Sequence, residues 1–502
     1  MNVVPDPVVF AASHAEGKPL VVWTTLVNDL ETPVSAMLKL AESQPYSFLL
    51  ESVEGGETLG RYSLIGIKPD MIWRCRGTRC ELNRQALSAP DAFEPMADAP
   101  FDAIRNLLAE CRIELPETLP PMSAGLFGYL GYDMVRLIER LPDTNPDTLG
   151  IPDAVLMRPT VMVIFDNIKS LVTVVTPVWP SSKISTEAAY QAAQVRLNNV
   201  LVDLEHCLTN RRGTPGPVTD GPALPPSNTS RAEYHAMVDK AKEYIRAGDI
   251  FQVVPSQRFA LPFTLPAFAL YRSLRRLNPS PYLFYLNFDG FSLIGSSPEI
   301  LVQLRDGKVT IRPIAGTRRR GASGTEDRAL EQELLADPKE RAEHLMLLDL
   351  GRNDVGRVAK IGTVRVTDQF VIERYSHVMH IVSNVEGALD AERFDALDAL
   401  AAGFPAGTVS GAPKVRAMEI IDELEKARRG FYGGCVGYFS ASGMMDTCIA
   451  LRTGLVKDGM LYVQSGGGVV ADSDPEAEYQ ETVNKAKALF RAAEEAVRFG
   501  AG

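Results

Sequence analysis

Short apolar runs alternate with polar turns along the first 210 residues. Runs of β-branched and aromatic residues bounded by turn formers predict strands, and apolar residues spaced three and four apart predict helices. Several predicted strands follow one another without an intervening helix, so antiparallel pairing is expected. We predict strands at 47–53, 62–67, 161–165 and 170–175, and helices at 101–111 and 185–207.

A second pattern begins at residue 230. Ser230 and Glu233 form a capping box, in which the hydroxyl and the carboxylate can each satisfy an orphan backbone N–H. Apolar residues then recur at helical spacing as far as Ile245, and Gly248 predicts the end of this helix. Further strands are predicted at 251–259, 282–287, 292–296, 300–304, 309–313, 433–440, 447–455 and 460–465.

Residues 211–230 separate the two patterns. The segment is dense in Pro, Gly, Ser and Thr and nearly free of large apolar residues, which is typical of a linker. We therefore predict an N-terminal region over 1–210, a linker over 211–230 and a C-terminal region over 231–502. The expected fold class is α+β, with two antiparallel β-sheets packed face to face and helices on the outside.

Composition narrows the class of protein further. The 502 residues carry a net charge of −11, which disfavours a nucleic-acid-binding protein, because such proteins usually display a basic patch. No apolar run approaches the ~18 residues of a membrane span, and residues 1–12 lack the pattern of a signal peptide. The six cysteines show no metal-like spacing, so reduced thiols and a cytoplasmic location are expected.

One pair of carboxylates lies near the start of a predicted helix. Asp337 is a suitable N-cap and Pro338 a suitable first helical residue. Glu340 and Glu343 follow at i and i+3, on a face that Leu347 continues toward the interior. Carboxylates on a face that becomes apolar are costly unless they are paired or bind a metal.

A second pair repeats this arrangement near the C-terminus. Residues 473–476 predict another capping box, and Glu478 and Glu481 again lie at i and i+3. If the two helices face each other, four carboxylates converge on one hard cation, and Mg²⁺ fits such an all-oxygen set. A di-iron site would need Glu-x-x-His pairs, which neither stretch supplies. A solvated helix face is the alternative for either pair alone.

Four features suggest anion binding and proton transfer. The glycine-rich turn at 464–468 can expose backbone N–H groups to an anion, and a cationic loop lies at 316–321, although each could be a solvated turn. Arg452 lies among apolar neighbours of a predicted strand, where a guanidinium requires a carboxylate partner. His377 and His380 titrate near neutrality, but on a strand at most one lines a given site, and each could be a structural hydrogen-bonder.

From about residue 230 to 490 the chain resembles the chorismate-utilising enzymes, and component I of the anthranilate synthases in particular. The matching motifs occur in unbroken order, which makes the resemblance specific. They lie at 248–257, 295–299, 312–317, 343–347, 352–354, 407–413, 432–434 and 466–481.

The resemblance implies a reaction and a role for each motif. Ammonia would attack C2 of chorismate with loss of the 4-hydroxyl, and pyruvate would then be eliminated to leave an aromatic ring. Glu343 and Glu481 would bind Mg²⁺, with Glu340 and Glu478 acting through waters or on the ammonia side. The catalytic residues would be Glu299, His380 and Thr408, with an acid needed because hydroxide is a poor leaving group. The substrate would contact Gln252, Ala315, Tyr432, Arg452, Gly466, Gly467, Gly468 and Lys485.

Two positions distinguish between the possible products of this family. Relatives that form isochorismate or salicylate carry a lysine base where this chain has Gln252, and aminodeoxychorismate synthases carry a lysine where it has Ala315. Both departures favour anthranilate. The alternatives are an aminodeoxychorismate or isochorismate synthase, a catalytically silent protein that binds tryptophan or a partner, and a metal phosphohydrolase that uses the arginines at 318–320.

Regulation and partners follow from the same resemblance. Segments of both regions resemble the tryptophan-binding segments of the family, so tryptophan is expected as an inhibitor. No glutaminase sequence follows residue 490, so a separate glutamine amidotransferase small subunit is expected to supply ammonia within a hetero-oligomer. The tryptophan-binding residues would be Leu50, Glu51, Ser52, Tyr62, Pro281 and Tyr282.

Overall fold

The computed structural model describes residues 2–41, 44–54, 58–180, 184–208, 224–375 and 378–500. Every strand pairing within this part of the chain is antiparallel, which confirms the predicted α+β class.

All but two short strands belong to one closed hydrogen-bonded network, and β9 and β18 pair only with each other. The strands are β1 (Leu20–Val27), β2 (Ser47–Glu54), β3 (Thr58–Arg76), β4 (Arg79–Asn83), β5 (Glu94–Pro95), β6 (Gly125–Leu130), β7 (Ala154–Asp166), β8 (Leu171–Val178), β9 (Gln252–Val253), β10 (Ser256–Pro262), β11 (Tyr282–Asn287), β12 (Phe291–Ser297), β13 (Ile300–Arg305), β14 (Lys308–Ile311), β15 (Ile314–Arg319), β16 (Arg365–Arg374), β17 (Val378–Ala388), β18 (Gly411–Ala412), β19 (Cys435–Ser440), β20 (Met445–Ile449), β21 (Thr453–Lys457) and β22 (Met460–Gly466).

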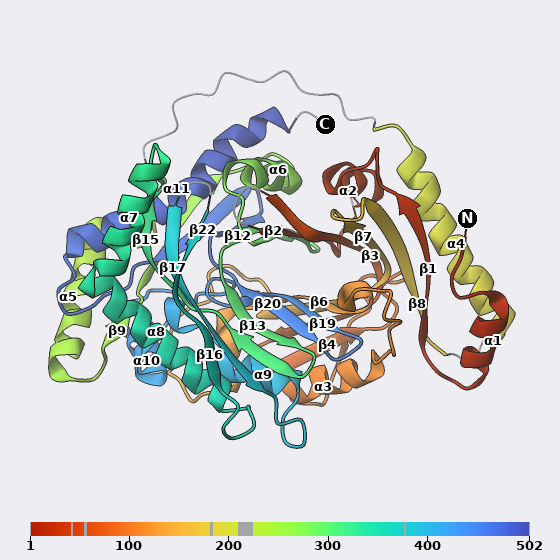
Figure 1. Cartoon of the computed structure of the whole chain (residues 1–502), viewed down its shortest axis with the longest axis horizontal. Coiled ribbons are helices and arrows are strands. Elements are labelled where there is room, and N and C mark those ends of the chain that lie inside the picture. Colours follow the sequence, from red (N-terminus) through yellow and green to blue (C-terminus); the bar gives the residue numbers. More distant parts are fainter. Residues whose placement is uncertain are drawn as a thin grey trace.

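Helices surround this network (Figure 1). The α-helices are α1 (Pro7–Ala15), α2 (Pro33–Ala41), α3 (Pro100–Glu110), α4 (Thr186–Glu205), α5 (Arg231–Ala247), α6 (Ala267–Leu277), α7 (Gly324–Ala336), α8 (Pro338–Gly356), α9 (Ala396–Gly403), α10 (Lys414–Leu424) and α11 (Pro475–Glu495). The short 3-10 helices are η1 (Pro121–Ser123), η2 (Tyr132–Leu137), η3 (Gly407–Val409) and η4 (Ala496–Arg498).

Three buried clusters show how the layers stack. The central core is built from strands and the loops between them, and in it the Phe48 ring of β2 stacks on the Phe127 ring of β6 at 4.8 Å. The next residue along β2, Leu49, points the other way, into a second cluster beneath α2, α4, α5, α6 and α11. A third cluster lies beneath α3, α8, α9 and α10. The sheet therefore folds over on itself with helices on both outer faces, as the sequence predicts.

Strand β3 turns the corner between the two layers. Its outward side chains Ile65 and Ile67 join the α6-side cluster, whereas Met71 and Trp73 join the α9-side cluster. The change occurs at a bulge in the pairing with β7, just after Pro69. Bulges bend a strand and increase its twist, which lets one strand serve both layers.

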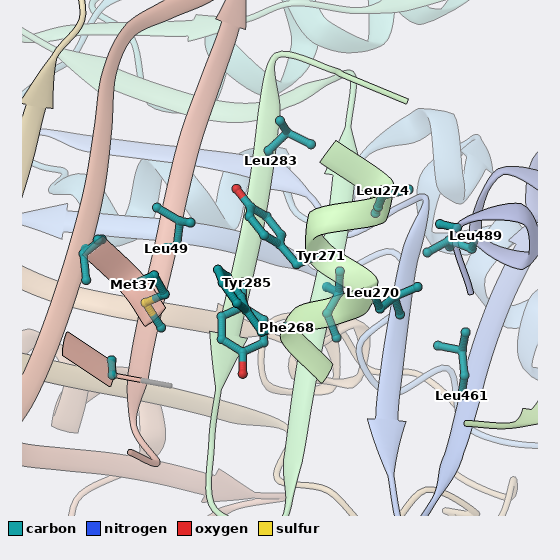
Figure 2. Packing of buried hydrophobic residues seen from close by; sticks show 14 of the residues in the cluster. Met37, Leu49, Phe268, Leu270, Tyr271, Leu274, Leu283, Tyr285, Leu461 and Leu489 are labelled. Carbon is teal, nitrogen blue, oxygen red and sulfur yellow. The ribbon is translucent and has the colours of Figure 1, made fainter. Parts of the chain in front are cut away.

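Helix α6 shows how the outer helices attach (Figure 2). Phe268, Leu270, Tyr271 and Leu274 form its buried face, and the Phe268 ring lies 5.0 Å from the ring of Tyr285 on β11. Each such side chain stabilises the fold by about 1.5–3 kcal/mol on burial. Truncating Leu270 to Ala would cost about 2–5 kcal/mol.

The two predicted regions contribute to the same sheet. Strand β2 pairs with β11, with Ser52 opposite Tyr282, and β6 pairs with β19, with Leu130 opposite Cys435. Residues 209–223, which include most of the predicted linker, lie outside the described part of the chain.

Most predicted helix ends are confirmed. Ser230 and Glu233 form the capping box of α5, and Gly248 ends that helix in a left-handed conformation. Asp337 caps α8, which continues to Gly356. The predicted cap of α11 is wrong: Asp474 is the N-cap, because the neighbouring Ser473 hydroxyl is used by a buried glutamate. No helix among the described residues is long and apolar enough to cross a membrane.

Candidate active site

Glu343 lies at the centre of the predicted carboxylate group. Its Oε1 accepts a hydrogen bond from Nε2 of Gln252 at 3.2 Å. Burial raises the pKa of Glu343, the Glu340 and Glu481 carboxylates raise it further, and the Gln252 donor lowers it. Helices α8 and α11 therefore bring these acids close enough to influence one another.

The α11 acids have different partners. Glu481 pairs with Lys485 at 2.7 Å, and Lys485 also donates a hydrogen bond to the Gly466 carbonyl at 3.0 Å. Burial lowers the pKa of Lys485, but the Glu481 carboxylate outweighs that effect and leaves it raised. Glu478 is buried, its Oε1 accepts a hydrogen bond from Ser473 at 2.7 Å, and its Oε2 has no partner within the described chain.

These residues fit a divalent cation only in part. As the side chains stand, the described residues contain no group of three or more Asp, Glu, His or Cys placed to hold a metal. Yet burial raises the pKa of both Glu343 and Glu478, and the Oε2 of Glu478 lacks any partner. Excess buried carboxylate of this kind is what a hard cation compensates, so Glu343 and Glu478 could hold Mg²⁺, with the half-exposed Glu481 carboxylate beside them.

The cationic loop predicted at 316–321 is not a free anion site. Arg318 pairs with Glu333, Asp337 and Glu340 at 2.8–2.9 Å, and the two following arginines pair with acids of α7. The loop thus ties β15 to α7 and α8. It also holds the Glu340 carboxylate, whose charge acts on Glu343.

Glycines 466–468 bring the backbone directly against the site. A Cβ on Gly468 would lie 2.5 Å from Nε2 of Gln252, and one on Gly467 would lie 3.0 Å from Oε2 of Glu478. A Cβ on Gly466 would lie 3.0 Å from the hydroxyl of Tyr432. Each position therefore requires glycine if the neighbouring side chain is to stay in place.

Glu299 and Thr408 lie together at a small buried cavity. Glu299 follows β12, and Thr408 lies in η3. Burial raises the pKa of Glu299 to about 8, against the opposing influence of the Thr408 hydroxyl and the Ile314 backbone N–H. At neutral pH the carboxyl therefore keeps its proton and can serve as an acid.

His380, on β17, has the opposite character. Its Nδ1 lies 3.0 Å from the Gly316 carbonyl and 3.0 Å from the Thr317 hydroxyl. A carbonyl can only accept, so Nδ1 carries the proton and Nε2 keeps a lone pair. Burial lowers the pKa of His380 to about 4, and the Arg452 charge contributes. His380 is thus neutral and can accept a proton; His377 lies outside the described residues.

Arg452 is placed differently from the prediction. It lies between β20 and β21 rather than within a strand, with a positive φ of 48°. A non-glycine residue in that conformation costs of order 1 kcal/mol or more, and such strain often accompanies function. Burial lowers the pKa of Arg452, and no carboxylate of the described residues forms an ion pair with it. The carboxylate partner predicted for Arg452 is therefore not found among the described residues.

Tyr432 and Ala315 complete the set. The Tyr432 side chain is buried, and its hydroxyl lies near the backbone N–H of Gly466. Ala315 lies on β15 opposite Ile381, one residue from the bulge at Gly316. The structure therefore places all the predicted catalytic and substrate residues around one region between α8, α11 and β17.

The sequence analysis missed one buried residue of this region, Arg429. Its guanidinium pairs with Glu425 at 2.6 Å and donates to the carbonyls of Val254 and Val409, each at 2.6 Å. It also lies 5.5 Å from the ring centroid of Tyr432. Arg429 thus joins three segments that carry predicted site residues. Its position just before the 432–434 motif was the signal available in the sequence.

A second site lies between β2, β11 and β20. A cavity of about 570 Å³ is lined by every residue predicted to bind tryptophan. At its polar end the Asp446 carboxylate accepts hydrogen bonds from Tyr282 at 3.2 Å and Gln303 at 2.7 Å. We call this space the regulatory cavity, after the tryptophan-binding role predicted from the sequence. Its wall includes Leu50, Glu51, Ser52, Tyr62, Pro281, Tyr282, Pro298, Ile300, Arg312, Ile314, Tyr375, Val436, Tyr438 and Asp446.

The Glu51 side chain binds residues of helix α6. Its fully buried carboxylate pairs with Arg275 at 2.6 Å and accepts hydrogen bonds from Tyr271 and Ser63. These bonds fix the strand that forms one wall of the regulatory cavity.

Comparison with known proteins shows the family of the chain. A family model described as chorismate binding enzyme matches residues 47–491. Anthranilate synthase component 1 of Cereibacter sphaeroides is 63% identical over 490 residues, covering 98% of this chain and 97% of the relative. The Aquifex aeolicus protein of the same name is 48% identical over 476 residues, covering 94% of both chains.

Solved structures agree as well. The crystal structure of anthranilate synthase component I from Streptococcus pneumoniae superposes with a TM-score of 0.73 at 36% identity, covering 93% of this chain and 99% of that one. A menaquinone-specific isochorismate synthase from Escherichia coli has a TM-score of 0.68 at 19% identity, covering 97% and 100%, and so shares the fold. The chain belongs to the chorismate-binding enzymes and, within that family, to the anthranilate synthase component 1 proteins.

Proposed function

We propose that the protein converts chorismate to anthranilate with Mg²⁺ and ammonia, as the large subunit of an anthranilate synthase that tryptophan inhibits. The observation that carries this proposal is a pair of buried groups with opposite protonation. Glu299 is protonated and His380 is neutral at pH 7, because their pKa values lie near 8 and 4. Groups whose pKa values are pushed apart in this way can act as acid and base in one reaction.

The anion-binding groups match a substrate with two carboxylates. Arg452 is a partly buried cation without an ion pair in the described chain, and with Tyr432 it would bind the enolpyruvyl carboxylate. The second carboxylate would meet the backbone at 466–468 and Lys485. Mg²⁺ bound by Glu343 and Glu481, with Glu340 and Glu478 around it, would neutralise this carboxylate.

The remaining residues then perform the proton transfers. Glu299, with Thr408 beside it, would protonate the departing 4-hydroxyl. The Nε2 lone pair of His380 would accept a proton during the loss of pyruvate and aromatisation. Both roles depend on burial, which sets the two pKa values.

Gln252 favours ammonia as the nucleophile, and Ala315 favours anthranilate over aminodeoxychorismate as the product. Gln252 lies beside Glu343 and cannot act as a base, so a water molecule there would be hard to activate. Ammonia already has a free lone pair and needs no such base.

The regulatory cavity is proposed as the tryptophan site. Its volume of about 570 Å³ lies within the usual range for small-molecule sites, and it combines apolar walls with polar groups at one end. Arg305 and Asp446, at 3.2 Å from each other, could bind the carboxylate and the ammonium of an amino acid.

The proposed role as the large subunit is tested by comparing two nitrogen sources. The purified chain is incubated with chorismate and Mg²⁺, and either an ammonium salt or glutamine, and products are separated by chromatography. We expect anthranilate with ammonium and none with glutamine, because a separate amidotransferase subunit would supply the ammonia. Glu299→Gln is the matched control and should give none with either. Aminodeoxychorismate or isochorismate as the product would contradict the proposal.

A further inference from the structure

The regulatory cavity and the catalytic region share a wall. Pro298 and Ile300 line the cavity, and they are the chain neighbours of Glu299. Ile314 also lines the cavity, and its backbone N–H acts on the Glu299 carboxyl. Any ligand that presses on this wall therefore presses on the residues that hold Glu299 in place.

Tyr375 completes the wall on the His380 side. It lines the regulatory cavity and is largely buried. Its ring meets the His380 ring edge to face, with centroids 5.5 Å apart and planes at 63°. Protein interiors are close-packed, so the Tyr375 ring cannot shift without changing the position available to His380.

The polar atoms of Tyr375 are held by residues around the cavity. The hydroxyl donates a hydrogen bond to Oε2 of Glu373 at 2.9 Å, and Glu373 pairs with Arg312, which also lines the cavity. The backbone carbonyl accepts a hydrogen bond from Arg320 at 2.7 Å. The Tyr375 ring is thus bound to the cavity wall at its hydroxyl and packed against His380 at its edge.

We propose that Tyr375 is a positioning residue that couples the regulatory cavity to catalysis by holding His380. A ligand in the cavity that displaces the Tyr375 ring moves His380, and inhibition follows without competition for the substrate site. This inference rests on the proposed function, in which tryptophan binds the cavity. Arg452 and Lys485 are not among the residues that line the cavity, so a direct clash of the two ligands at those groups is not required.

If Tyr375 couples the two sites, a variant of Tyr375 can keep tryptophan binding and lose inhibition by tryptophan. A ligand shifts an equilibrium only through a difference in its affinity for the two states. If the Tyr375 contact is weakened, tryptophan still fills the cavity, but its occupancy no longer changes the position of His380. The inhibition constant should then rise while the dissociation constant stays nearly constant.

The test measures both constants on the full chain. The variants are Tyr375→Phe, which removes the bond to Glu373, and Tyr375→Leu, which also removes the ring contact with His380. The Kd of tryptophan is measured by calorimetry. Its inhibition constant, taken as the tryptophan concentration that halves the activity, is measured with ammonium at chorismate well below KM. We expect the ratio of inhibition constant to Kd to be near one in the wild type. It should rise about threefold in Tyr375→Phe and at least about tenfold in Tyr375→Leu.

Tyr62→Phe is the matched control, because Tyr62 lines the same cavity but is not among the residues that contact His380. Any change in its two constants should be shared, which leaves their ratio near one. Glu373→Ala supplies an independent variant if Tyr375→Leu does not fold, and it should behave like Tyr375→Phe. A ratio that stays within twofold of the wild-type value in every folded Tyr375 and Glu373 variant would overturn the coupling role. Failure of tryptophan to bind the wild type would instead contradict the proposed regulatory site.

Discussion

The Gln252 carboxamide donates a hydrogen bond to the Glu343 carboxylate at 3.2 Å, which leaves its own Oε1 buried without a partner in the described chain. This one bond links the residue that favours ammonia to an acid proposed to bind Mg²⁺. It fixes the direction of the amide and opposes the rise that burial causes in the pKa of Glu343.

Gln252→Leu should weaken the binding of the Mg²⁺ that activity requires. Without the donor, the pKa of Glu343 rises further and less of the carboxylate is available to the cation. A hydrogen bond to a charged group contributes about 1.5–3 kcal/mol, so the half-saturating Mg²⁺ concentration should rise about tenfold or more. Gln303→Leu removes a similar donor from Asp446 at 2.7 Å in the regulatory cavity and should leave that concentration unchanged. Equal shifts in the two variants would contradict the link.

The Glu299 carboxyl should impose an upper pH limit on activity. The acid acts in its protonated form, so kcat/KM should stay level below the pKa of about 8 and fall above it. Glu299→Gln should abolish turnover across the whole range. A profile in wild type that shows no decline between pH 7 and about 9.5 would contradict the role of Glu299 as the acid.

The same residue should also make stability depend on pH. The folded state keeps a proton on Glu299 that the unfolded chain loses above its ordinary pKa of 4.5. Stability relative to Glu299→Gln should therefore fall as pH rises from 4.5 to about 8 and then stay level. Thermal unfolding of both proteins at pH 5 and pH 8 checks this, and the Tm advantage of the variant should be larger at pH 8.

Arg452→Met should stabilise the protein while weakening substrate binding. The guanidinium is partly buried without an ion pair in the described chain, so an apolar side chain of similar length removes a desolvation cost. Loss of a charged contact costs about 2–5 kcal/mol of binding, which corresponds to an increase in KM for chorismate of at least about 30-fold. Tm and KM should thus both rise; a lower Tm would show that Arg452 has a protein partner in solution.

Glu51→Gln should destabilise the fold and loosen the regulatory cavity. Its carboxylate is fully buried, whereas Arg275 is about a quarter exposed, so breaking their pair should cost about 2–3 kcal/mol. Arg61→Gln removes a more exposed pair with Asp166 and should cost less than about 1 kcal/mol. Urea unfolding curves compare the two variants, and equal losses would contradict the importance of burial at Glu51.

Local sequence patterns predict the individual helices and strands better than they predict how these elements pack together. The β-rich run at 62–67 predicts part of β3, but only the structure shows that the bulge after Pro69 lets this strand serve both layers, because that depends on partners far along the chain. The helix start at Asp337 is predicted because its signals are local. The start of α11 is misplaced by one residue, since Glu478, which is itself buried by the fold, takes the Ser473 hydroxyl.

Prediction of the candidate active site is limited in the same way. Carboxylates at i and i+3 indicate shared faces on α8 and α11, but spacing does not reveal that Arg318 binds Glu340 or that Lys485 binds Glu481. The Arg452 position in a left-handed turn is likewise set by the approach of β20 and β21. Pairings of this kind depend on tertiary contacts, which a single sequence does not encode in its periodicity.

The most direct test of the central claim is the fluorescence of anthranilate after mixing the purified chain with chorismate, Mg²⁺ and an ammonium salt. We expect a continuous rise that EDTA stops, and none with Glu299→Gln. Consumption of chorismate without anthranilate, or a rise that is unaffected by EDTA, would contradict it.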